Sequence, residues 1–228
     1  MPTLLVANKL YSSWSLRPWL LMRQLGIAFN EILIPLGHAN TPLRIREHSP
    51  AGKVPILKDG EITVWDSLAI MEYVAERWPE AGVWPLEREA RAHARSISAE
   101  MHSGFAALRS ACPMNLGKRF AGRDRGDKVA QDASRVEAIW REAQSRFGRG
   151  GPFLFGAFSA ADAMYAPVVT RLDTYGFEVS PESRTYMDAV LGLPAFVEWR
   201  EAALRESWTI AHDEVDEPAL VDFRKQTG

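Results

Sequence analysis

Short apolar runs alternate with helix-forming stretches in the first third of the chain. Residues 3–7 are apolar without a helical period, which is typical of a buried strand. Residues 19–25 are good helix formers, and Gly26 follows them in the position that glycine commonly takes just past a helix end. Residues 29–36 then predict a second strand. The chain therefore begins as a strand, a helix and a strand.

A hairpin and another helix complete this first pattern. The apolar runs 54–57 and 62–65 flank Asp59-Gly60, a dipeptide that favours a two-residue hairpin turn. A short helix is expected before the hairpin, and Asp66-Ser67 opens a longer one after it. This order predicts a βαβαββα thioredoxin-like domain, in which a mixed four-stranded sheet carries helices on both faces.

Helical periodicity replaces these short runs in the rest of the chain, and strand signals nearly vanish. The expected helices share apolar positions spaced three and four residues apart, and they cover residues 87–109, 129–147, 160–175, 182–191 and 194–205. Ser159 and Asp162 resemble a capping box at the start of the third of these helices. The last twenty residues are polar and partly acidic, so we expect a partly ordered tail.

Proline and glycine interrupt the pattern between the two halves, which predicts a linker there. We expect a thioredoxin-like domain over residues 1–80, a linker over residues 81–88 and an all-helical domain over residues 89–228. Each of these domains is long enough to bury a core of its own.

The composition limits the kinds of partner. The 27 basic and 29 acidic side chains leave a net charge of −2 and no basic stripe, so we expect no nucleic acid. No apolar run approaches the ~20 residues of a membrane span, and the N-terminus lacks the form of a signal peptide, so we expect no membrane and a cytoplasmic location. The single Cys112 excludes an internal disulfide and a cysteine zinc site. No cluster has metal-ligand spacing, so we expect no metal.

A hydroxyl-rich turn lies between the first strand and the first helix. It contains Ser12, Ser13 and Ser15, followed closely by Arg17. Hydroxyl groups and unpaired backbone N–H groups at a helix start suit an anion. The alternative is that the serines serve only the turn and the helix cap, for which Ser15 is the plausible residue.

Three local motifs, in this order of elements, resemble the cytosolic glutathione transferases over nearly the whole chain. The segment from Ser12 to Arg17 is similar to the serine-bearing turn of the zeta, theta and delta classes. Lys53-Val54-Pro55 stands where the family has its cis-proline segment. Asp66-Ser67 opens the third helix, where the family has an acidic residue or glutamine followed by serine.

The resemblance implies that the protein binds glutathione as a co-substrate and activates its thiol for attack on a small, largely apolar electrophile. A free thiol with a pKa of ~8.5 is only about 3% ionised at neutral pH, and a hydroxyl donor would stabilise the thiolate. We expect Ser12, with Ser13 next, to be that donor, and Tyr11 is a third candidate. The residues expected to bind the rest of glutathione are Ser15, Lys53, Val54, Pro55, Asp66 and Ser67.

The second substrate should lie between the domains and face the hydroxyl turn. Candidates for its pocket are aromatic, sulfur-containing or polar residues at helical spacing, namely Trp14, Met101, His102, Phe105, Arg109, Met114 and Tyr165. Cys112 is expected to be only a small apolar side chain. Trp14 stands where the zeta turn has cysteine, so the maleylacetoacetate isomerase activity of that class is not expected to carry over.

Two other functions fit the same fold. One is a non-catalytic adaptor with the glutathione transferase fold, and the other is a glutathione-dependent isomerase or peroxidase. The resemblance also implies a homodimer, to which the faces of the helices around Ile97 and Trp140 are expected to contribute.

Overall fold

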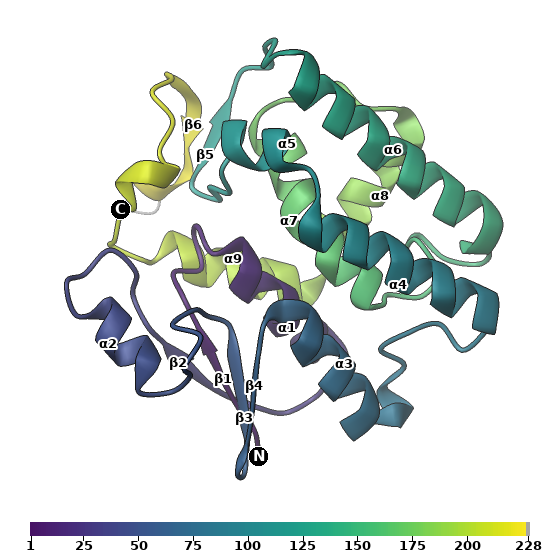
Figure 1. The fold of residues 1–228 in the computed structure, drawn as a ribbon. Helices are drawn as coiled ribbons and strands as arrows, with labels where there is room; N and C mark the ends of the chain where they lie inside the picture. The colour runs from purple at the N-terminus through teal and green to yellow at the C-terminus, as the bar shows by residue number, and fades with distance from the viewer. Residues whose placement is uncertain (227–228) are drawn as a thin grey trace.

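A mixed four-stranded sheet forms the N-terminal part of the computed structural model, which describes residues 1–226 (Figure 1). Its strands are β1 (Thr3–Val6), β2 (Asn30–Leu33), β3 (Ile56–Asp59) and β4 (Ile62–Trp65), in the spatial order β2-β1-β3-β4. β1 pairs in parallel with β2 and antiparallel with β3, which pairs antiparallel with β4. The sheet predicted from the apolar runs is therefore confirmed.

Helices cover both faces of this sheet. They are α1 (Ser13–Gln24), α2 (Thr41–Arg46) and α3 (Ser67–Arg77), with the short 3-10 helix η1 (Pro79–Ala81) after them. Leu4 and Val6 of β1 join the large core that includes residues of α1 and α3. Leu5 lies in a small cluster with Ile45 of α2. This alternation follows from the two-residue period of a strand.

The hairpin turn lies one residue later than its signal suggested. Asp59 pairs with Ile62, so the two residues between the strands are Gly60 and Glu61. Gly60 has a φ of 59°, a left-handed conformation that glycine adopts without steric cost. Asp59 therefore remains paired with β4, and Gly60 is the first residue of the turn.

The rest of the chain is mainly helical (Figure 1). Its helices are α4 (Arg88–Ser103), α5 (Ala106–Ala111), α6 (Asp127–Phe147), α7 (Ala160–Thr174), α8 (Pro181–Leu191) and α9 (Pro194–Leu204). α7 is buried at almost every position and packs against α1, α4 and α8. The capping box predicted at Ser159 and Asp162 begins this helix.

The single helix predicted over residues 87–109 is wrong, because the chain breaks it at Gly104 and Phe105. The Gly104 N–H still bonds to Glu100 O, but Phe105 takes a φ of 58°. A Cβ on Gly104 would lie 2.7 Å from Glu100 O. Glycine therefore permits the sharp exit, and burial of the Phe105 ring offsets the cost of the left-handed backbone.

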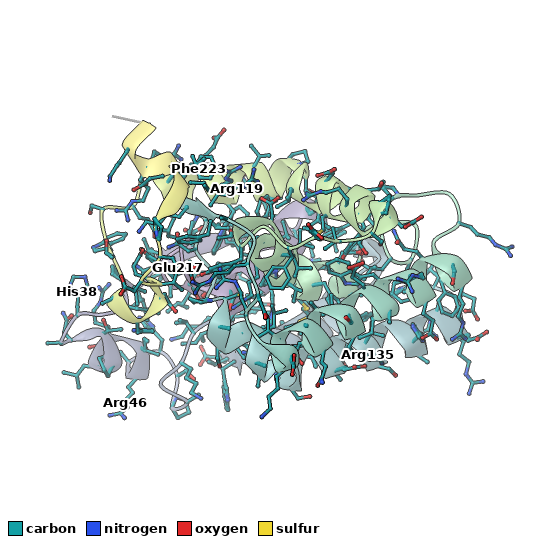
Figure 2. The ribbon with its side chains drawn as sticks, turned by 90° about the horizontal axis from the view of Figure 1, so that it is seen from above. His38, Arg46, Arg119, Arg135, Glu217 and Phe223 are labelled. Atoms are coloured by element: carbon teal, nitrogen blue, oxygen red, sulfur yellow. The ribbon has the colours of Figure 1, made fainter. Side chains whose placement is uncertain are left out.

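A two-stranded sheet corrects the expectation of an all-helical second part. β5 (Lys118–Phe120) pairs antiparallel with β6 (Ala219–Asp222), which lies between the 3-10 helices η2 (Ala211–Asp213) and η3 (Phe223–Gln226). Glu217 also receives hydrogen bonds from Arg123 and Arg125. Figure 2 shows Glu217 and Phe223 of this segment at the end of the molecule where His38 lies. The described part of the tail is thus ordered by partners distant in sequence.

Two further expectations concern the organisation of the chain. The boundaries at residues 81 and 88 stay a prediction. Ile97 and Trp140 are buried inside the chain, so the helix faces that carry them pack into its own core and are not available to a second copy.

Within residues 1–226 no helix has both the length and the apolar character needed to cross a membrane.

Candidate functional site

The hydroxyl turn connects β1 to α1, and its serines have different partners. Ser12 is the N-cap of α1, and its Oγ accepts a hydrogen bond from the Ser15 N–H at 3.4 Å. The Ser12 hydroxyl donates to Ser15 Oγ at 2.9 Å. Ser15 is fully buried, and its Oγ also accepts from the Ala7 N–H. The prediction that Ser15 caps the helix is wrong, because α1 begins at Ser13.

Ser13 and Tyr11 complete the turn. The Ser13 hydroxyl has no hydrogen-bond partner in the described part of the chain, and Ser13 lines the cavity in front of the turn. Tyr11 also lines this cavity, but its hydroxyl donates to Glu214 at 2.5 Å. Burial and this carboxylate raise the pKa of Tyr11 far above its ordinary value of 10. A phenol already engaged by a carboxylate is a poor donor for a second anion.

The turn forms one wall of a cavity of about 360 Å³. The N-terminal part contributes Tyr11, Ser12, Ser13, Trp14, Leu36, Ile45, Gly52, Lys53 and Val54 to its lining. The later part of the chain contributes Arg109, Pro113, Met114, Arg171 and Asp213. The cavity therefore lies between the two parts of the chain, where sequence reasoning expected it.

The Val54–Pro55 peptide bond is cis, as the family resemblance implied. Val54 and Lys53 line the cavity opposite the later part of the chain. The Lys53 side chain is exposed and forms no ion pair within residues 1–226. A lysine and an exposed backbone segment thus stand beside the hydroxyl turn.

Asp66 and Ser67 lie at the start of α3, as predicted, but outside the lining of this cavity. Asp66 Oδ1 accepts from the Leu68 N–H at 2.9 Å, and Asp66 Oδ2 lies 3.4 Å from His102 Nε2. Ser67 is fully buried, and its Oγ accepts a hydrogen bond from Arg17. Only Asp66 of this pair has a side chain that a ligand could touch, because Ser67 has no exposed surface.

Arg17 is a buried cation behind these residues. Its Nη1 donates to Ser67 Oγ at 3.2 Å, its Nε has no partner within residues 1–226, and its guanidinium stacks 4.4 Å from the Trp14 ring. Burial, together with the charges of Arg109 and Arg171, lowers the pKa of Arg17 to about 9. The group remains charged at neutral pH and gives the site a positive potential.

Arg109 and Arg171 bring further positive charge to the cavity. The Arg109 guanidinium lies 5.0 Å from the centroid of the Trp14 ring, which Arg17 also contacts. Arg171 is a residue of α7 that the sequence reasoning did not select. Its position on a helix gave no signal, because a helical arginine is usually solvated or paired. Asp213 was not predicted either, because the tail that carries it was expected to be only partly ordered.

The remaining pocket candidates separate into lining and core residues. Trp14, Arg109 and Met114 line the cavity, and His102 lies instead beside Asp66. The expectation for Met101, Phe105 and Tyr165 is wrong, because their side chains are buried in the hydrophobic core. Burial also raises the pKa of Cys112 to about 11, so this thiol is inert packing material, as expected.

Family comparisons fit this geometry. The sequence matches the family model described as the N-terminal domain of glutathione S-transferase over residues 11–77. It matches the model of the C-terminal domain over residues 126–202. The chain belongs to the glutathione S-transferase family. The N-terminal match covers the hydroxyl turn, the cis-proline segment and the start of α3.

Individual relatives of this glutathione S-transferase family member are distant. A probable maleylacetoacetate isomerase from Caenorhabditis elegans is 24% identical over 192 residues, covering 81% of this chain and 86% of its own. A Burkholderia glutathione transferase homolog with bound glutathione superposes with a TM-score of 0.67 at 22% identity, covering 89% of this chain and 97% of its own. Human glutathione-S-transferase T1-1 superposes with a TM-score of 0.63 at 22% identity, covering 99% of this chain and 96% of its own.

Metal ligation is a separate question. Among residues 1–226 no three histidine, cysteine or acidic side chains gather in a way that could hold a metal ion. The side chains that the cavity offers are hydroxyl groups, cations, the carboxyl group of Asp213 and apolar surface. This set suits an anionic sulfur nucleophile and the groups around it.

Proposed function

We propose that the protein transfers glutathione to an electrophilic carbon. The observation that carries this proposal is the Ser13 hydroxyl, which has no hydrogen-bond partner among residues 1–226, lies at the N-terminus of α1 and lines the same cavity as the cis-proline segment. Sequence reasoning preferred Ser12, but the Ser12 hydroxyl is engaged by Ser15. We therefore propose that the Ser13 hydroxyl donates the hydrogen bond that stabilises the glutathione thiolate. Ser12 serves beside it as the N-cap of α1.

The rest of glutathione has matching groups in the N-terminal part of the chain, on the cavity wall and at the start of α3. Val54 offers its backbone N–H and C=O to an extended peptide, in the manner of a strand addition. Lys53 supplies a point charge for a carboxylate, and Asp66 supplies a carboxylate for the ammonium group. Ser15 and Ser67 are buried, so in this proposal they hold Ser12 and Arg17 in place without touching the ligand.

The reaction is a nucleophilic attack by the bound thiolate. The thiol proton passes to solvent, the sulfur forms a bond with the electrophilic carbon, and a leaving group departs with its electron pair. In an addition to an activated double bond, the carbon next to the attacked one takes up a proton instead. A hydrogen bond to the charged sulfur is worth roughly 1.5–3 kcal/mol, which lowers a thiol pKa by about one to two units.

Titration of the protein with glutathione tests this proposal directly. We expect calorimetric binding and an ultraviolet thiolate signal whose midpoint lies about one to two pH units below the ~8.5 of a free thiol. Binding with an unshifted midpoint would favour the non-catalytic adaptor. The absence of binding at millimolar glutathione would remove both the ligand and the reaction from this proposal.

We also propose a homodimer that uses the outer face of β4 and α3. Trp65 and Ile62 of β4 are 45% and 50% exposed, and Trp65 borders an open, largely apolar hollow of about 680 Å³ with Leu68. Exposed apolar surface of this kind marks an interaction site, and a second copy in symmetric contact would cover it. The family relationship supports this assignment.

Trp65→Glu is expected to convert the dimer into a monomer, because it places a charge in the proposed contact. Sedimentation equilibrium of the two proteins at one concentration measures the change. Leu86→Glu is the matched control, since Leu86 is 88% exposed and lies outside the hollow. A wild-type monomer, or a dimer that Trp65→Glu leaves intact, would contradict this interface.

A further inference from the structure

Arg109 and Arg171 place two positive charges on the wall of the cavity that the thiolate would face. Neither forms an ion pair with a carboxylate of the described chain, whereas Arg125, Arg135 and others elsewhere do. Arg171 is almost completely buried on α7. Burying a charge is costly unless it is paired, so a buried arginine that lacks a carboxylate indicates a missing anion.

The hydrogen bonds of the two arginines leave donors free. Arg171 Nε donates to Cys112 O at 2.8 Å and Nη1 to Pro167 O at 3.0 Å, so backbone carbonyls engage two of its three guanidinium nitrogens. Its Nη2 has no hydrogen-bond partner within residues 1–226. Arg109 Nη1 donates to His102 O at 3.3 Å, and its other nitrogens likewise have no partner there. Both residues line the cavity.

The acid on the same wall forms no ion pair with either arginine. Asp213 is this acid, and its close cation is His212 at 3.7 Å. Burial, opposed by the charges of His212 and Arg171, raises the pKa of Asp213. Burial and the charge of Arg109 lower the pKa of Arg171 to about 10, although the charge of Asp213 opposes this shift.

We infer that the electrophile which this protein attacks carries a carboxylate, and that Arg171 and Arg109 bind that carboxylate. This inference rests on the proposed glutathione transfer and narrows its substrate class. Arg109 Nε and Nη2 form a planar fork that matches a carboxylate in geometry and charge, and Arg171 Nη2 adds a further donor. Met114, Pro113 and the ring of Trp14 give the same cavity apolar surface for the carbon skeleton.

The carboxylates of glutathione itself are a less suitable occupant. Lys53, Val54 and the serine turn, which the proposed function assigns to the tripeptide, all belong to the N-terminal wall. The two arginines belong to α5 and α7 on the opposite wall. In this proposal the two arginines bind the carboxylate of the second substrate. They hold that carboxylate at a distance from the carbon that the thiolate attacks.

Product analogues measure this selectivity without turnover. The probes are S-carboxymethyl- and S-(4-carboxybenzyl)glutathione, each with its neutral carboxamide counterpart, titrated by calorimetry beside glutathione alone. Charge-assisted hydrogen bonds predict that at least one acid binds about tenfold or more tightly than its amide. Arg109→Met and Arg171→Met should each reduce that ratio toward one while the dissociation constant for glutathione changes less than about threefold.

Controls separate the possible failures. Arg141→Met removes one exposed cation of α6 and should keep the full acid preference. Arg109→Met is informative even if loss of the buried Arg171 unfolds the chain, because Arg109 is only half-buried. Equal affinities of acid and amide in both pairs, a preference that survives Arg109→Met, or an equal loss of glutathione affinity would overturn the inference. Failure of glutathione itself to bind would instead overturn the proposed function.

Discussion

Ser13→Ala is expected to lower the turnover number with a generic aromatic halide electrophile by about 10- to 150-fold at pH 6.5 and saturating glutathione. The magnitude is the ~1.5–3 kcal/mol of a hydrogen bond to a charged acceptor, converted to a rate at ~1.4 kcal/mol per factor of ten. The Ser13 hydroxyl has no hydrogen-bond partner in the described chain, so its removal should change folding stability and glutathione affinity little. The rate and the thiol pKa of the complex are measured together.

The pH dependence distinguishes a thiolate donor from a merely structural residue. Without the donor the thiol pKa of bound glutathione rises toward ~8.5, so the thiolate forms again as the pH increases through that value. The rate deficit of Ser13→Ala should therefore shrink between pH 6.5 and pH 9. A structural defect would persist at every pH in this range.

Ser12→Ala and Ser96→Ala are the matched comparisons. Ser12→Ala removes the N-cap of α1, which costs about 1 kcal/mol of stability, and it should reduce the rate less than Ser13→Ala. Ser96 is an exposed serine of α4 whose loss should leave the rate unchanged. A larger, pH-dependent loss in Ser12→Ala would move the role to Ser12. Wild-type rates in both turn variants would rule out the hydroxyl mechanism.

The parts of the fold that sequence predicted are those governed by local physics. The strands around residues 3–7 and 62–65 follow from short apolar runs, and α6 follows from an amphipathic period sustained over twenty-one residues. The Asp66 cap and the capping box of Ser159 and Asp162 are local hydrogen-bond patterns with a recognisable spacing. Such features need no knowledge of distant contacts.

The errors have non-local causes. The tail looked polar and weakly structured, yet Glu214 accepts hydrogen bonds from Tyr11, Asn115 and Lys118, and no local pattern announces those partners. The break at Gly104 hides inside a regular apolar stripe, because one glycine is tolerated in most helical patterns. Met101 and Phe105 share the stripe that was read as pocket lining, and only packing shows that they face the core.

The candidate site was predicted on one wall and only in part on the other, where Arg109 and Met114 were named but Arg171 and Asp213 were not. The serine turn and cis-proline segment are contiguous in sequence, so their residues could be named. Arg171 and Asp213 reach the cavity only through the packing of α7 and the return of the tail. The charge that Arg171 adds to that wall, on which the proposed acidic electrophile rests, therefore appears only when the elements are assembled.

Asp162→Ala is expected to lower the free energy of unfolding by about 3 kcal/mol, the largest stability effect that we predict. Asp162 is fully buried, and its carboxyl accepts hydrogen bonds from the Leu154 N–H, the Ser159 N–H and the Ser159 hydroxyl at 2.9 to 3.1 Å. Alanine leaves two buried backbone N–H groups without partners, at a cost of ~1–3 kcal/mol each. Urea unfolding at one fixed protein concentration and pH 7.5 measures the difference.

The same residue should give the stability a pH dependence that the alanine variant lacks. Burial, opposed by these donors, raises the pKa of Asp162 from its ordinary 3.8 to about 6. The folded protein therefore binds a proton between pH 6 and pH 4 that the unfolded chain does not, so this contribution to stability increases as the pH falls through that window. The stability gap between wild type and Asp162→Ala should accordingly be wider at pH 5 than at pH 7.5.

Asp188→Ala is the control for removing a helical acid. Asp188 is exposed on α8, where it pairs with Arg184, and such surface pairs contribute at most ~0.5 kcal/mol. If Asp162→Ala lowered the free energy of unfolding by no more than Asp188→Ala does, the α7 capping box would not stabilise the fold. A gap that narrows toward pH 5 would mean that the three donors outweigh burial and hold the carboxyl ionised. Either result would change which interaction is taken to anchor α7, the helix that also positions Arg171.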